Sequence, residues 1–261
     1  MQADFFAKKR RSTLGFLTIL GAITLLAIVI TEYNIVKGFA SLPKAVEWGL
    51  SNFYPTKESL TKLPAIFDKL IETLLVSIAA TTTGAAVALL FAVLGSNTTR
   101  VNAFFGSICR AIATIFRNID VAAWALILLF SFGQSSLTGY LALFFGSFGF
   151  LTRAFVETID EVSGGSVEAL QATGASYFSI ISQSVIPSSL PQMISWILFM
   201  IETNIRSATL IGLLTGSGIG FTFNLYYKSL DYDTASLVVV AIIVAILLIE
   251  SVSNSVRRVI L

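Results

Sequence analysis

Residues 166–187 read SVEALQATGASYFSIISQSVIP and form a polar island between long apolar segments. Ser166 is a favourable helix N-cap, and Glu168 places a negative charge in the first turn, where it complements the helix dipole. Gly174 can end this helix in a left-handed conformation, and a second helix is expected to begin near Ser176. The polar island is therefore predicted to be two short helices with a glycine joint.

The second helix carries one apolar stripe. Phe178, Ile181 and Val185 fall on one helical face, before Pro187 and Pro191 end the pattern or begin the next helix. These features fit an amphipathic pair lying on the membrane surface. They also fit a segment through which a cytoplasmic partner moves the neighbouring spans.

The composition is that of an integral membrane protein. Of 261 residues, 55% are hydrophobic and only 12% are charged, with a mean hydropathy of +0.84. The net charge of +2 gives no reason to expect a nucleic-acid partner. Cys109 is the one cysteine and histidine is absent, which excludes an intramolecular disulfide and Cys-His chemistry. No metal site and no cofactor are expected in this chain, and Cys109 is interpreted as a small buried apolar residue.

The N-terminus is predicted to be a cytoplasmic basic segment, residues 1–13, followed by a transmembrane anchor at residues 14–31. A basic start and an apolar core also occur in signal peptides, but this run is long and no clean cleavage site follows it. Residues 32–69 are expected outside, although their five lysines count against that orientation. Trp48, Phe53 and Tyr54 suggest a helix at the membrane interface there.

Five further spans are predicted at residues 70–95, 111–132, 137–155, 192–214 and 234–253. The fold class is thus an all-α integral membrane protein with about six transmembrane helices and both termini cytoplasmic. Residues 70–256 form one transmembrane domain, and residues 257–261 form a cytoplasmic tail. Counting the spans places a loop at residues 157–190, which contains the polar island, on the cytoplasmic side.

Charged residues inside spans are costly in lipid and are expected to face protein or water. Glu202, Asn204 and Arg206 lie in the middle of the fifth span, and Glu202 can pair with Arg206 four residues later. Arg117 and Asp120 repeat this arrangement in the third span. Such pairs can fix helix packing only, or their arginines can line a path for an anion.

Glycines 212–220 do not form a nucleotide-binding loop, because the following Lys-Ser/Thr and a preceding strand are missing. Gly216, Gly218 and Gly220 are instead predicted to form a turn that closes the outer mouth.

The polar island resembles the EAA loop of ABC importer permeases. Glu168, Ala169, Gly174 and Pro187 stand at the spacing of that loop, although Leu170 replaces its second alanine. A wider set of residues is similar to the phosphonate-importer permeases over roughly residues 70–258: Arg117-Asn118, Trp124-Ala125-Leu126, residues 167–176, Glu202, residues 204–209 and residues 218–220. Asp120, Thr215 and Ser217 depart from that pattern.

The resemblance implies a type I ABC importer permease (MetI-like) core preceded by one extra N-terminal span. It implies a cell-membrane subunit that moves phosphonate or a related phosphorus oxyanion from an extracytoplasmic substrate-binding protein. Partners would be a cytoplasmic ABC ATPase dimer, which binds ATP and Mg, and a second permease copy. A homodimer is expected because each chain has one EAA-like loop.

The resemblance also implies residue roles. Glu168 would orient the coupling loop, Gly174 would give its bend, and Phe178 and Ile181 would be apolar contacts in an ATPase groove. Candidate translocation-path residues are Arg117, Asn118, Glu202, Asn204 and Arg206. A forked guanidinium suits a phosphorus oxyanion better than an ammonium does.

Other functions remain open. The chain has no Walker motif, so hydrolysis would occur in a partner, and the convergent side chains of an intramembrane enzyme are missing. The charged pairs alone would permit a passive anion channel, and phosphite, phosphate or another small solute could replace phosphonate. Arg153 with Glu157, Asp160 and Glu161 is either a solvated inner rim or an ATPase contact.

Overall fold

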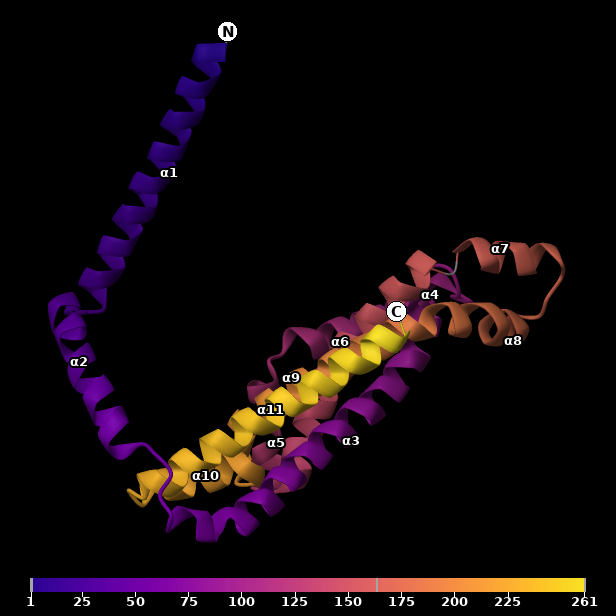
Figure 1. The fold of residues 1–261 in the computed structure, drawn as a ribbon. Coiled ribbons are helices and arrows are strands. Elements are labelled where there is room, and N and C mark those ends of the chain that lie inside the picture. Colours follow the sequence, from indigo (N-terminus) through magenta and orange to yellow (C-terminus); the bar gives the residue numbers. More distant parts are fainter. Residues whose placement is uncertain (1, 163, 261) are drawn as a thin grey trace. The chain divides into compact units, whose positions relative to one another are not determined.

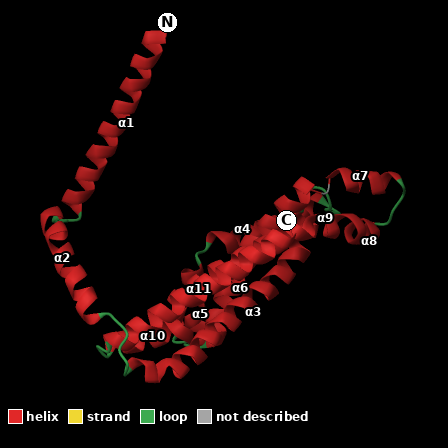
Figure 2. Ribbon diagram, in the orientation of Figure 1, coloured by secondary structure: helices red, strands yellow, loops and turns green. Residues whose placement is uncertain are grey.

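The computed structural model describes residues 2–162 and 164–260, and Figure 1 shows the order of their elements. Figure 2 shows that every regular element in these residues is helical. The prediction of an all-α protein is therefore confirmed. The chain divides after Phe53 into two units.

The first unit consists of α1 (Gln2–Ile30) and α2 (Ile35–Asn52). The apolar stretch Lys9–Ile30 of α1 is 22 residues long, which gives about 33 Å of helix, enough to cross a bilayer core. The anchor predicted at residues 14–31 ends with this helix. Asn34 caps α2 by accepting a hydrogen bond of 2.9 Å from a backbone N–H in its first turn. The helix expected between residues 32 and 69 is thus present.

The second unit is a helical bundle centred on one helix, α6, which contacts α3, α4, α5 and α9. Its elements are η1 (Ser59–Lys62), α3 (Leu63–Gly95), α4 (Ala103–Asn118), α5 (Val121–Phe132), α6 (Ser136–Val162), α7 (Gly164–Ala172), α8 (Tyr177–Ile180), the π-helical turn η2 (Ile181–Val185), α9 (Ile186–Thr215), α10 (Gly218–Lys228) and α11 (Tyr232–Ile260). In the described residues of both units, five helical segments are long and apolar enough to cross a membrane. If the bent pair α4–α5 is counted as one span, the total is six, as predicted.

The second span begins earlier than predicted, at Leu63 instead of residue 70. Pro64 occupies the first turn of α3, where its missing N–H would have no helical partner. Lys69 and Glu72 pair at 2.7 Å within the helix, so these charges do not end it. The other ends move as well: α6 continues to Val162, and α11 includes the tail predicted at residues 257–261 up to Ile260.

The third span, predicted at residues 111–132, is a bent pair of helices, α4 and α5, and begins earlier, at Ala103. The chain bends by 90° between α4 and α5. Asp120 causes the break locally, because its carboxylate accepts a hydrogen bond from Ala122 N at 2.8 Å and caps α5. The predicted Arg117–Asp120 ion pair does not form, since Asp120 is used as this cap.

The bend packs closely on α6 because α6 carries glycine there. A Cβ at Gly149 would lie 2.5 Å from Arg117 N, and one at Gly146 would lie 2.6 Å from Val121 Cγ2. Beside the bend, the rings of Phe116 and Trp124 stack with their centroids 5.1 Å apart. The bend is therefore held by close backbone packing and by aromatic contacts.

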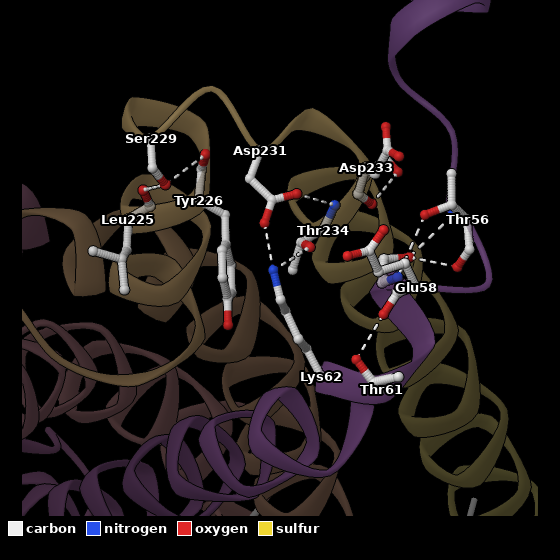
Figure 3. A network of polar contacts seen from close by, with 12 residues as sticks. Thr56, Glu58, Thr61, Lys62, Leu225, Tyr226, Ser229, Asp231, Asp233 and Thr234 are labelled. Carbon is white, nitrogen blue, oxygen red and sulfur yellow. Dashed lines mark hydrogen bonds and ion pairs between the residues drawn. The ribbon is translucent and has the colours of Figure 1, made fainter.

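A polar network joins the start of α3 to the turn between α10 and α11 (Figure 3). Lys62 Nζ lies 2.6 Å from Asp231 Oδ2 and 3.2 Å from Thr234 Oγ1, and it sits 5.1 Å from the centre of the Tyr226 ring. Burial alone would raise the pKa of Asp231, but the hydrogen bonds from Lys62 and Thr234 outweigh this and lower it. The network fixes one end of the bundle.

The glycines predicted to form the outer turn differ in backbone geometry: two have positive φ and one is helical. Gly216 ends α9 in the left-handed region (φ +66), and Gly218 also has positive φ (+62). Gly220 lies in α10, where a Cβ would come within 1.8 Å of the backbone oxygen of Thr209. The turn thus lies at Gly216 and Ser217, and its closing of the outer mouth stays a prediction. Gly220 is needed because α9 and α10 touch through their backbones.

We expect Gly220→Ala to destabilise the bundle by about 3 kcal/mol or more, because the added methyl must push α10 away from α9. The thermal unfolding temperature of the purified chain in detergent measures this. Gly165→Ala is the matched control, because a Cβ there meets nothing within 4 Å and its φ is not positive. Equal unfolding temperatures for the two variants would contradict this packing.

Candidate functional site

The polar island has the predicted helix, joint and second helix, with two corrections. The first helix, α7, begins at Gly164, so Ser166 is not its N-cap; the Ser166 hydroxyl instead accepts a hydrogen bond of 2.7 Å from Ser184. Gly174 is the left-handed joint, with φ +77. Ser176 caps α8 by accepting a hydrogen bond from Ser179 N.

The second correction concerns the second helix, which is not short. Tyr177–Thr215 forms one continuous helical segment made of α8, η2 and α9, so the predicted fifth span starts well before residue 192. Pro187 lies in the first turn of α9 and Pro191 lies inside it. A proline cannot donate to the preceding turn, and the wider π turn just before Pro187 accommodates this. The second half of the polar island, from Tyr177, is thus continuous with the fifth span, whereas α7 is a separate helix.

The island contacts the bundle through one face and leaves the other open. Val167 is buried in the core, and Ile181 packs against the same cluster. Phe178 is 82% exposed, and Glu168, Ala169, Gly174 and Pro187 are also exposed. Of the two predicted apolar contacts, Phe178 is therefore the open one and Ile181 is half covered.

The predicted pair in the fifth span forms. Arg206 Nη2 lies 2.9 Å from Glu202 Oε1, and Arg257 Nη2 from α11 lies 3.9 Å from Glu202 Oε2. Sequence spacing could not reveal Arg257, which is brought to Glu202 by helix packing. Glu202 thus has a basic group on either side.

Asn204 is fully buried and does not line an opening within this chain. Its Nδ2 donates to Thr81 Oγ1 at 2.8 Å and to Ser147 Oγ at 2.6 Å, which joins α9 to α3 and α6. Arg117 and Asn118 lie on α4, and no described hydrogen bond or ion pair connects them with Glu202 or Arg206. The candidate path residues therefore do not form one cluster: Asn204 is buried between helices, and the residues of α4 are not bonded to the Glu202–Arg206 pair.

The charged residues predicted to act together at the end of α6 have different surroundings in the structure. Arg153 Nε and Glu157 Oε1 form an exposed pair at 2.5 Å, and Glu161 is exposed. Asp160 accepts hydrogen bonds from the side chains of Ser96, Asn97 and Thr98 in the turn between α3 and α4. Only the polar run at residues 96–99 signals this contact in the sequence.

Comparisons with known proteins agree with these features. The family described as binding-protein-dependent transport system inner membrane component matches residues 84–260. The phosphate-import permease protein PhnE of Mycolicibacterium smegmatis is 29% identical over 191 residues, 73% of this chain and 36% of that relative, so the chain spans about a third of its length. The putative phosphite transport system permease protein HtxC of Stutzerimonas stutzeri is 27% identical over 100% of this chain and 91% of its own length.

Solved structures show the same fold. An inward-facing form of the MetNI methionine ABC transporter has a TM-score of 0.65 at 19% identity, covering 79% of this chain and 99% of the other. An amino acid ABC transporter has a TM-score of 0.64 at 15% identity, covering 76% and 95%. The MetI-like fold is thus shared over about four fifths of the chain. Since the family match covers well over half of the sequence, the chain belongs to the binding-protein-dependent transport system inner membrane component family.

Proposed function

We propose that this protein is the permease subunit of an ABC importer that carries phosphonate or a closely related phosphorus oxyanion. The relatives that support this substrate class are named as phosphate, phosphite and phosphonate permeases, among them a cryptic phosphonate permease protein of Escherichia coli that is 33% identical over 118 residues. An extracytoplasmic binding protein would deliver the anion. ATP and Mg would be bound by a partner ATPase, and this chain would not itself be an enzyme.

The observation that carries the proposal is the polar island. Its exposed face, with Glu168 and the 82% exposed Phe178, is free to contact a cytoplasmic ATPase. Behind the Gly174 joint, Tyr177–Thr215 continues as one helical segment into the bundle. A displacement of the island by closing ATPases would therefore tilt the fifth span directly. A passive channel or a surface-lying amphipathic pair has no need of this connection.

A homodimer is proposed because each chain supplies one polar island while ABC ATPases work in pairs. With α4 and α5 counted as one bent span, the chain has six candidate spans, and six crossings would leave both termini on one side. The basic residues near both ends support a cytoplasmic location for that side. This orientation puts the polar island where an ATPase can reach it and the Gly216–Gly220 turn on the outer side.

ATP-dependent uptake tests the proposal. Proteoliposomes would hold this chain with a candidate ATPase and a candidate binding protein, and uptake of labelled methylphosphonate, phosphite and phosphate would be measured. We expect uptake of at least one of these anions only with internal ATP and the binding protein. An ATPase variant that cannot hydrolyse ATP is the control. Anion flux that needs no ATP would support a channel, and ATP-driven uptake of a different solute would refute the substrate class.

Coupling at the joint can be tested with Gly174→Val. A β-branched residue at φ +77 costs about 2 kcal/mol or more, while no neighbouring atom lies within 4 Å to clash. We expect ATP hydrolysis to continue while uptake falls at least about tenfold. Gly165→Val, in α7 and equally free of neighbours, is the control and should keep uptake. Coupled uptake at the normal rate by Gly174→Val would rule out the joint as the transmitting element.

A further inference from the structure

A polar cavity of about 290 Å³ lies between α4 and α6, beside the turn that joins α3 to α4. Its lining includes three arginines, two carboxylates and a threonine hydroxyl: Arg110, Arg117, Arg153, Glu157, Asp160 and Thr114. Glu157 and Asp160 lie near the end of α6 that leads into the polar island, so the cavity occupies the same end of the bundle. None of the coupling residues lines it.

One wall of the cavity is the polar face of α4, the first helix of the bent α4–α5 pair. Arg110, Thr114 and Arg117 follow one another at intervals of four and three residues, so they share one face of α4. Phe104 and Ile115, on other faces of α4, are largely exposed. In a membrane such a helix turns its apolar side to lipid and its charged side to a hydrated space. The cavity is that space.

Both carboxylates in the cavity lining already form hydrogen bonds or an ion pair within the chain. Asp160 Oδ1 accepts from Ser96 Oγ at 2.5 Å and from the Thr98 backbone and side chain, and its Oδ2 accepts from Asn97 Nδ2 at 3.1 Å. Glu157 is paired with Arg153 Nε at 2.5 Å. Asp160 keeps its negative charge although neutral donors bond its oxygens, so the lining carries one more positive charge than negative.

The arginines keep unused donors. Arg110 uses one terminal nitrogen, Nη1, to bond Asn97 Oδ1 at 3.1 Å. Arg153 bonds through Nε only, and among the described residues Arg117 forms no ion pair and no side-chain hydrogen bond. Three guanidinium groups thus line the cavity against two carboxylates, and most of their terminal N–H groups have no acceptor.

We propose that this cavity is an inner binding site for a phosphate-class oxyanion, held by Arg117 and Arg110. A tetrahedral anion with several oxygens matches the paired N–H groups of a guanidinium, and the volume accommodates it together with water. The transport role of this site rests on the proposed function. The site extends that function by adding a place where the anion binds at the cytoplasmic end of the bundle. The phosphate group would come from the transported anion or from an anionic lipid headgroup.

Binding of inorganic phosphate to the full chain tests the site. The chain would be purified in a maltoside detergent, which carries no phosphate, and phosphorus NMR line broadening would report weak binding. We expect broadening with the unchanged chain and about tenfold weaker affinity for Arg117→Gln, because a charge-assisted donor is lost. Since Arg117 makes no side-chain bond, this variant should retain its fold, which size-exclusion chromatography checks.

Arg258→Gln is the matched control, because Arg258 is an exposed arginine of α11 outside the cavity and its loss changes the net charge equally. Its phosphate affinity should equal that of the unchanged chain. Short-chain phosphatidylglycerol, added in a parallel titration, identifies the source: if it displaces phosphate and its own binding depends on Arg117, the natural occupant is a lipid headgroup. No binding of either molecule, or equal binding by all three chains, would overturn the site.

The site and the proposed function can fail separately. ATP-driven phosphonate uptake without Arg117-dependent binding would remove the site and leave the importer. Arg117-dependent binding in a protein that takes up no phosphorus anion would remove the substrate class and leave an oxyanion site.

Discussion

The amide of Asn204 is the polar contact on which the centre of the bundle depends. It donates to hydroxyls of α3 and α6 from a position with no exposed surface, so three spans share one hydrogen-bonded point. In lipid there is no hydrophobic force to draw helices together, and such bonds between close-packed small residues set their register. Gly146 and Gly149 extend this arrangement along α6 by admitting the bent α4–α5 pair.

This arrangement determines what a force on the polar island would do. The second half of the island, from Tyr177, belongs to the same helical segment as Asn204, so a tilt of that segment would be transmitted to α3 and α6. The left-handed Gly174 and the π turn before Pro187 are the two places along this path where the backbone departs from an ordinary helix. The bundle would move as a body while the bending is confined to these turns.

Local features were predictable from the sequence. The Gly174 joint, the start of the second helix near Ser176 and the Glu202–Arg206 pair depend on residues within four positions of one another, and the structure has all three. The break in the third span was missed because the polar residues beside it, Arg117, Asn118 and Asp120, were interpreted as parts of one continuous span. Asp120 was assigned to an ion pair, yet the energy of capping α5 and the fit of the bend on α6 decide its position.

Contacts between distant segments could not be predicted. Asp160 holds the α3–α4 turn, Arg257 reaches Glu202, and Asn204 is buried instead of facing a path, each because of packing over more than fifty residues of chain. The start of α3 was placed too late because paired charges such as Lys69 and Glu72 resemble a surface connection in the sequence. Hydropathy alone therefore gives the number of spans better than their ends.

The most direct test of the account is a photo-crosslink from the polar island to the ATPase. A photoreactive phenylalanine would replace Phe178, with Phe130 of α5, which is 92% exposed, as the equally accessible control. The account predicts a crosslinked product with the ATPase from position 178 and none from position 130. A crosslink from position 130 with none from position 178 would contradict it, since the ATPase would then contact a different part of the bundle.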